Sequence, residues 1–138
     1  MRVCRNSKEP DSILERKNNY RTDQLWHRIE QIFILECLLA DYRSKNGSLY
    51  SPLENEKALH HLILSKTGWA LNDIRKLSLN DSMLIIAREL RKENIPTDAQ
   101  TFLNGMKLPV KPYPLDDFPD TDWAPKEDSK LLQTGVYL

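Results

Sequence analysis

The sequence predicts an all-α protein: a small bundle of four to five helices with a basic N-terminal arm and an extended, proline-rich acidic C-terminal tail. No window alternates apolar and polar residues for long enough to propose a sheet. Five of the eight prolines lie between Pro109 and Pro125, whereas residues 22–107 contain only two. Residues 1–21 carry six basic and three acidic side chains, a balance of +3, and residues 108–138 carry three and six, a balance of −3. We therefore expect an arm (1–21), a helical domain (22–107) and a tail (108–138).

The first helix of the domain is expected to begin at Thr22 or Asp23, since both residue types cap helix N-termini. Asn46-Gly47 is expected to end it, because glycine tolerates the left-handed conformation that follows a helix. Apolar residues recur at helical spacing between these points. They are Leu25, Ile29, Ile32, Phe33, Leu39 and Ala40.

The start of the second helix has the most specific local signal in the chain. Ser51 and Glu54 have the spacing of a capping box, and Pro52 occupies the first helical position between them. We expect this helix to run to about Lys66 and to stop at Thr67-Gly68.

Three shorter helices complete the predicted domain. One covers residues 69–77, and the next begins after Ser78 as its N-cap and ends near Asn94. The last helix is expected to be capped by Thr97 and to end at Asn104-Gly105.

Length and composition indicate a single cytoplasmic domain. The chain has 138 residues and no net formal charge, and no apolar run approaches the roughly 18 residues of a membrane span. The positive N-terminus is not followed by the apolar segment of a secretory signal. Two cysteines, Cys4 and Cys37, cannot form a disulfide framework and are typical of a reducing compartment.

Glu36 is the one carboxylate expected near the middle of an apolar helix face. A buried carboxylate must find a donor or become protonated. Arg43, His60 or Arg75 could supply that donor, which would make Glu36 structural. The alternative is an enzyme that uses Glu36 and His60 in acid–base catalysis, and we rank it third among the functions considered.

No cofactor or metal site is predicted. Adjacent His60 and His61 point about 100° apart on a helix, and Glu56 with His60 gives two ligands without a third. Cys37 has no second cysteine nearby in the sequence, and the four glycines form no phosphate-binding or nucleophile-elbow pattern. We therefore expect a protein that is not an enzyme.

The favoured prediction is a non-enzymatic protein–protein interaction module, which could be an adaptor, an inhibitor or immunity-type protein, or an assembly subunit. Some apolar residues lie outside the expected core faces, either on outer helix faces or in the acidic tail, and they could be covered by the arm, by a second copy in a homodimer or by a protein partner. The predicted partner-binding residues are Ile34, Leu38, Leu84, Ile85, Phe118 and Trp123.

The alternative prediction is a small nucleic-acid-associated regulator. Its mechanism would be contact with phosphates rather than readout of bases, because the start of the fourth helix is apolar and acidic. The N-terminal arm and a set of basic side chains would make those contacts. The set comprises Arg75, Lys76, Arg88, Arg91 and Lys92.

Overall fold

The computed structural model describes residues 20–125, so the predictions for most of the arm and for residues 126–138 lie outside it. Within the described residues the protein is all-helical, which confirms the predicted fold class. The α-helices are α2 (Tyr20–Asn46), α3 (Lys57–Thr67), α4 (Leu71–Arg75), α5 (Leu79–Ile85) and α6 (Thr97–Met106), and the 3-10 helices are η2 (Lys92–Asn94) and η3 (Asp120–Asp122).

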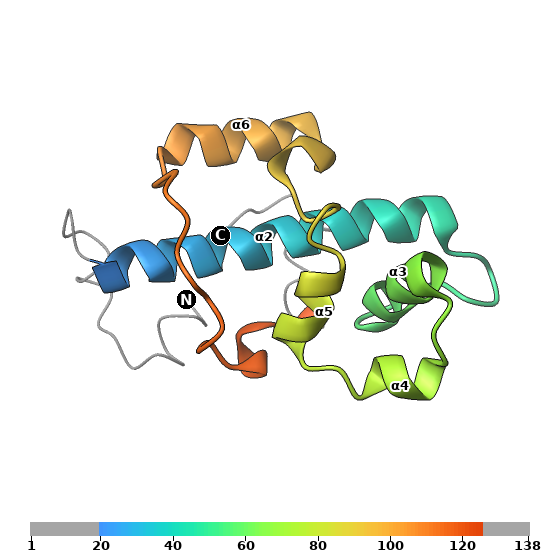
Figure 1. The fold of residues 1–138 in the computed structure, drawn as a ribbon. Coiled ribbons are helices and arrows are strands. Elements are labelled where there is room, and N and C mark those ends of the chain that lie inside the picture. The colour runs from blue at the N-terminus through green and yellow to red at the C-terminus, as the bar shows by residue number, and fades with distance from the viewer. Residues whose placement is uncertain (1–19, 126–138) are drawn as a thin grey trace.

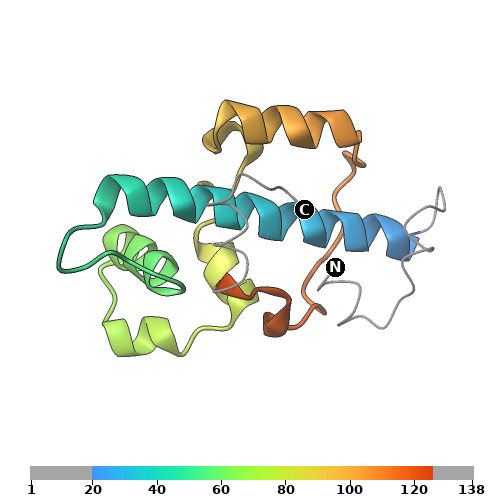
Figure 2. The ribbon, with the colours of Figure 1, turned by 180° about the vertical axis from the view of Figure 1, so that it is seen from behind.

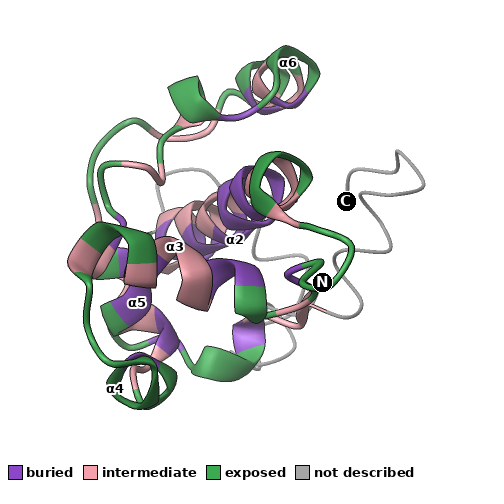
Figure 3. Cartoon of the chain, turned by 90° about the vertical axis from the view of Figure 1, so that its right-hand side faces the viewer, coloured by how far each residue is buried: buried purple, intermediate pink, exposed green. Residues whose placement is uncertain are grey.

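Helix α2 is the centre of the bundle. Its 27 residues give it a length of about 40 Å. Helix α6 lies on one side of it, and α3, α4 and α5 lie on the other (Figures 1 and 3). Eight consecutive residues, 32–39, are buried. Since eight residues make more than two helical turns, this part of α2 is covered on every face.

This complete burial corrects the prediction for Ile34 and Leu38. The helical wheel places both on an outer face, but they are only 6 % and 9 % exposed and belong to the main core. Phe33 packs against Phe102 of α6, with ring centroids 5.4 Å apart, while Ile34 faces α5 beside Met83. A helix placed between two layers has no outer face along its middle.

The predicted capping box at residues 51–54 is wrong. Helix α3 begins at Lys57, and no side chain caps its first turn. Residues 48–51 instead close a tight turn, in which the backbone N–H groups of Ser48 and Ser51 each donate to the other residue's carbonyl. Leu53 then adopts a φ of 61°, because its side chain turns inward and is 4 % exposed. Local capping propensity is outweighed here by burial of one leucine.

The predicted ends of the other helices are partly confirmed. Gly68 ends α3 in the left-handed conformation, with φ of 73°, and Ser78 caps α5 by accepting from the N–H of Asp81. Helix α5 stops at Ile85 rather than near Asn94, since the chain continues in turns and η2.

The remaining boundaries shift by a few residues. The third helix is shorter than residues 69–77, because α4 spans only Leu71–Arg75. Pro96 rather than Thr97 is the N-cap of α6. That helix runs past Asn104-Gly105 and ends at Lys107 in the left-handed conformation.

The segment after α6 packs against the bundle instead of leaving it. Residues 109–123, which we call the strap, run from the end of α6 across the first half of α2 to the start of α5 (Figures 1 and 2). Phe118 is 3 % exposed and forms a second core cluster with Leu25 and Ile29. In the part that is described, the predicted tail is therefore extended but not separate from the domain.

Within residues 20–125, no helix combines the length and the apolar character that crossing a membrane requires.

Candidate binding groove

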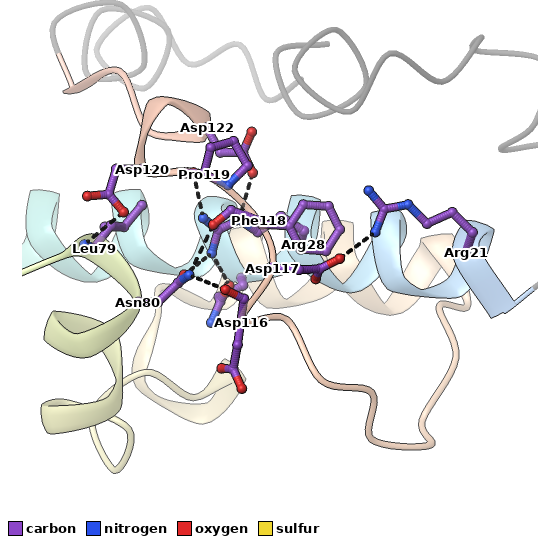
Figure 4. A network of polar contacts seen from close by, with 11 residues as sticks. Arg21, Arg28, Leu79, Asn80, Asp116, Asp117, Phe118, Pro119, Asp120 and Asp122 are labelled. Atoms are coloured by element: carbon purple, nitrogen blue, oxygen red, sulfur yellow. Dashed lines mark hydrogen bonds and ion pairs between the residues drawn. The ribbon is translucent and has the colours of Figure 1, made fainter.

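The strap is held to α2 by a network centred on Arg28, which is completely buried (Figure 4). Its Nε donates to Asp122 Oδ2 at 2.9 Å, and Nη2 donates to the carbonyl oxygen of Pro119 at 3.0 Å. Its Nη1 donates to Gln31 and to Asn80, at 2.8 and 3.0 Å. Four hydrogen bonds compensate the guanidinium for the water it has lost.

Asn80 connects the strap to α5. Its side-chain NH₂ donates to the carbonyl oxygens of Asp116 and Phe118, at 3.2 and 3.0 Å, while its Oδ1 accepts from Arg28. At Leu79, the residue before Asn80, the backbone N–H donates to Asp120 Oδ1 at 3.1 Å. This N–H belongs to the first turn of α5, where an acidic group is favourable.

Phe118 is the apolar anchor of the strap. The guanidinium carbons of Arg21 and Arg28 lie 4.5 and 5.5 Å from its ring centroid, which is the range of cation–π contacts. Arg21 also forms an exposed ion pair with Asp117 at 3.4 Å. Asp117 and Asp122 of the strap are thus paired with arginines of the same chain.

The beginning of the strap contacts the first turns of α2. Tyr113 donates its hydroxyl hydrogen to Asp23 at 2.7 Å and packs edge-on against His27, whose Nε2 lies 2.8 Å from the carbonyl oxygen of Pro109. The side-chain NH₂ of Gln24 donates to the carbonyl oxygen of Pro114. Since Tyr113 is bonded to a carboxylate, the pKa of its phenol is raised.

An open groove of about 450 Å³ lies between α2, α5, the turns that follow α5 and the strap. Its apolar lining includes Ile34 from α2, Met83 and Leu84 from α5, and Leu115 from the strap. Leu84 is the most exposed of these four residues, at 74 %. A groove of this size is within the roughly 300–1,000 Å³ of typical ligand sites, so it has room for a few side chains.

The charged groups that line the groove are acidic apart from a histidine. Glu30 and Asp116 contribute carboxylates, and the lining residues that the structure describes include no lysine or arginine. His27 and Asn80 also line it, but both are hydrogen-bonded to the strap. These two polar groups therefore position the strap.

The structure brings two of the predicted partner-binding residues together and separates the others. Ile34 and Leu84 meet in the groove, and Ile85 and Leu38 pack with the main core. Phe118 is buried between the strap and α2, and Trp123 is partly buried beside the core. The sequence could not show that the chain covers its own Phe118 and Trp123.

Glu36 is buried, as predicted, at 4 % exposure. The indole Nε1–H of Trp123 donates a hydrogen bond to this carboxylate. Trp123 is not among the donors that the sequence suggests. Arg43 uses its Nε to donate to the carbonyl oxygen of Leu53 at 2.8 Å. This arrangement supports a structural role for Glu36 and explains why Trp123 turns inward.

The basic residues of the alternative prediction lie in two places. Arg75 and Lys76 are exposed at the end of α4, whereas Arg88 and Arg91 are exposed in the turns after α5. These groups are at opposite ends of α5 (Figure 1). Lys92 donates to Asn104 of the α6 segment at 3.1 Å.

The other residues with potential chemistry are distributed outside the groove. Burial raises the pKa of Cys37 to about 12, with Glu36 and Asp98 adding to the shift. Burial also lowers the pKa of His60, with Glu56 opposing this effect and Arg75 adding to it. Among residues 20–125, no three histidine, cysteine or acidic side chains form a group that could hold a metal ion.

Comparison of the chain with known protein families, with curated proteins and with solved structures finds no match.

Proposed function

We propose that this protein is a non-enzymatic interaction module that binds an apolar turn or short segment of a protein partner in the groove between α2, α5 and the strap. The observation that carries the proposal is the exposed Leu84 at an apolar groove. Single exposed leucines are ordinary on protein surfaces, but this one lies in a concave site beside Leu115, with the nearly buried Ile34 and Met83 in the same lining.

The charge of the groove indicates the chemistry of the partner segment. Within residues 20–125, the groove is lined by the carboxylates of Glu30 and Asp116 and by no lysine or arginine. A segment with a lysine or arginine next to its apolar residues would complement these carboxylates, which favours the correct partner and speeds encounter.

Two polar residues of the groove lining hold the strap in place. Asn80 accepts a hydrogen bond from Arg28 and donates to two carbonyl oxygens of the strap, and His27 is hydrogen-bonded to the carbonyl oxygen of Pro109. Because a carbonyl oxygen only accepts, Nε2 of His27 is the donor in this contact, which fixes the ring against the strap.

Part of the predicted tail contributes to the proposed binding surface, but its two aromatic anchors do not. Phe118 and Trp123, which the sequence suggests as anchors for a partner, contact α2 of their own chain. Tyr113, Pro114, Leu115 and Asp116 of the strap still contribute, because they form one wall of the groove.

Selection of short random peptides displayed on phage tests this function. We expect the full-length protein to enrich peptides that combine apolar residues with lysine or arginine. Synthetic versions of these peptides should bind the wild type and lose at least tenfold in affinity for Leu84→Glu, because the new carboxylate enters an apolar, already acidic groove.

Val110→Glu is the matched control. Val110 is 98 % exposed and does not line the groove, so the same change in chemistry should leave peptide affinity unchanged. Peptides that bind Leu84→Glu as well as they bind the wild type would place the binding surface elsewhere and reject the groove.

A further inference from the structure

The turn of residues 48–51, between α2 and α3, presents two large apolar side chains to solvent. Leu49 is 87 % exposed and Tyr50 is 94 % exposed. They occupy the two central positions of the turn, which the reciprocal backbone hydrogen bonds between Ser48 and Ser51 close at 2.8 and 3.2 Å. Ser48 Oγ accepts a further hydrogen bond from the N–H of Ser51 at 3.1 Å.

The chain on both sides of this turn is tightly fixed. A Cβ at Gly47 would lie only 2.7 Å from the carbonyl oxygen of Arg43, so this position accepts no larger residue without a shift of the backbone. Arg43 Nε donates to the carbonyl oxygen of Leu53 at 2.8 Å. Leu53 and Asn55 have φ values of 61° and 56°, a left-handed conformation that is uncommon outside glycine.

A fixed turn loses little conformational entropy on binding, which favours it as a recognition element. Leucine and tyrosine add apolar area, and the tyrosine hydroxyl can still reach a polar partner when its ring is buried. Left-handed residues other than glycine are held only where the surrounding structure determines them, and they gather at functional positions.

From these observations we propose that the turn of one copy of this protein docks into the groove of a second copy. This inference depends on the proposed function, because it names the groove's partner. The groove has room for two side chains, and its apolar lining matches Leu49 and Tyr50. Lys45, five residues before Tyr50, is 70 % exposed in its side chain and forms a surface ion pair with Asp41 at 2.9 Å; such a pair contributes little, so the lysine can exchange Asp41 for Glu30 or Asp116 of the second copy.

The charges around the turn favour a protein pocket over an anionic membrane as its target. Lys45 and Lys57 are exposed, but so are Glu54 and Glu56. This mixture lacks the basic cluster that attracts a peripheral protein to acidic lipids.

The turn and the groove belong to different parts of the surface, so the contact is head-to-tail. Such a contact leaves a free turn at one end of the assembly and a free groove at the other, and it continues into longer assemblies unless the rotation closes a ring. A contact made by two side chains is small, and small interfaces are weak. We therefore expect association at high protein concentration.

Sedimentation equilibrium of the full chain tests this proposal. The mass of the wild type should rise with concentration above the monomer mass of 16.1 kDa, whereas Tyr50→Glu and Leu84→Glu should each remain at that mass. An equimolar mixture of the two variants should reach twice the monomer mass and no more. The intact turn of Leu84→Glu can dock into the intact groove of Tyr50→Glu, and the altered turn and altered groove that remain cannot extend the pair. Val110→Glu should associate like the wild type.

Two outcomes would overturn self-docking: a wild type that stays monomeric, or a Tyr50→Glu variant that still associates. Neither of these affects peptide binding to the groove, so failure of this inference differs from failure of the proposed function. All three substituted residues are exposed, and circular dichroism checks their folding.

A peptide provides a second measurement that does not depend on those variants. A cyclic peptide with the sequence of residues 47–52 should shift the NMR signals of Leu84 and Ile34 in the wild-type protein and dissociate the oligomers. Shifts confined to other residues would reject the second copy as the partner. Binding of the protein to lipid vesicles through Tyr50, without binding of the turn to the groove, would reject it too.

Discussion

Asp122 is buried together with Arg28, and both side chains are completely inaccessible to solvent. Removing one member of a buried pair leaves the other charge without compensation, which costs roughly 3–5 kcal/mol. We expect Asp122→Ala to lower the free energy of unfolding by this amount. Asp117→Ala removes an exposed ion pair with Arg21 and should cost about 0–1 kcal/mol. Urea denaturation of the two variants measures the difference, and equal effects would contradict the structural role of Arg28.

The thiol of Cys37 gives a pH-dependent prediction. Its pKa is about 12 in the folded protein, above its ordinary value of 9.0, because burial and nearby acidic groups disfavour the thiolate. The folded state therefore holds this proton more tightly than the unfolded state. The resulting stability is fully present below pH 9 and is lost as the pH rises from 9 toward 12.

Thiol labelling in a Cys4→Ser background checks this prediction. Cys37 should react with a thiol reagent only after urea unfolds the chain, since the thiolate is the reactive species. In a parallel denaturation series, Cys37→Ala should flatten the decline in stability above pH 9. Rapid labelling of the folded protein below that pH would show that the thiol is accessible.

Single residues could be predicted from the sequence when their burial follows from one helix. Glu36 is such a case, because its helical neighbours are apolar and it is buried as expected. Its donor Trp123 lies 87 residues away, and nothing in the local pattern selects it. Arg28 was missed although it is next to Ile29 on α2, because its acceptors come from α5 and the strap as well as from α2.

At the scale of helices, two serines test how far capping signals can be trusted. Ser78 accepts from the N–H of Asp81 and caps α5, while Ser51 lies in the turn before α3 and caps no helix. We expect Ser78→Ala to cost about 1 kcal/mol, the usual loss of an N-cap. Ser51→Ala should leave the denaturation midpoint within error of the wild type, and an equal loss in both variants would contradict the position where α3 begins.

The elements that follow strong local rules were predicted well. The end of α2 at Asn46, the left-handed Gly68 and the Ser78 cap all depend on residues close in sequence. The start of α3 and the end of α5 were predicted wrongly. Leu53 is buried in the core before α3 begins, and the chain continues in turns after Ile85. The groove also escaped prediction, because it needs the relative positions of three elements.

At the scale of the whole molecule, the strap decides whether the chain has a separable tail. A truncation after Leu108 removes Phe118 and uncovers Leu25 and Ile29. Burial of one large apolar side chain contributes roughly 1.5–3 kcal/mol, so we expect the truncated protein to lose at least this much stability. A chain that ends after Pro125 keeps the strap and is the control. If denaturation midpoints of the two truncated forms coincide, the strap does not stabilise the bundle.

The strap also has a consequence for the order in which this chain acquires its contacts during synthesis. Arg28 and Asp122 are 94 residues apart, so α2 leaves the ribosome long before the segment that completes its surroundings. At about 5–20 residues per second, this interval lasts on the order of 5–20 s. During that time Leu25 and Ile29 lack Phe118, their partner in the finished fold. Nascent chains stalled before residue 118 should therefore be better substrates for chaperones than chains stalled after the strap has emerged.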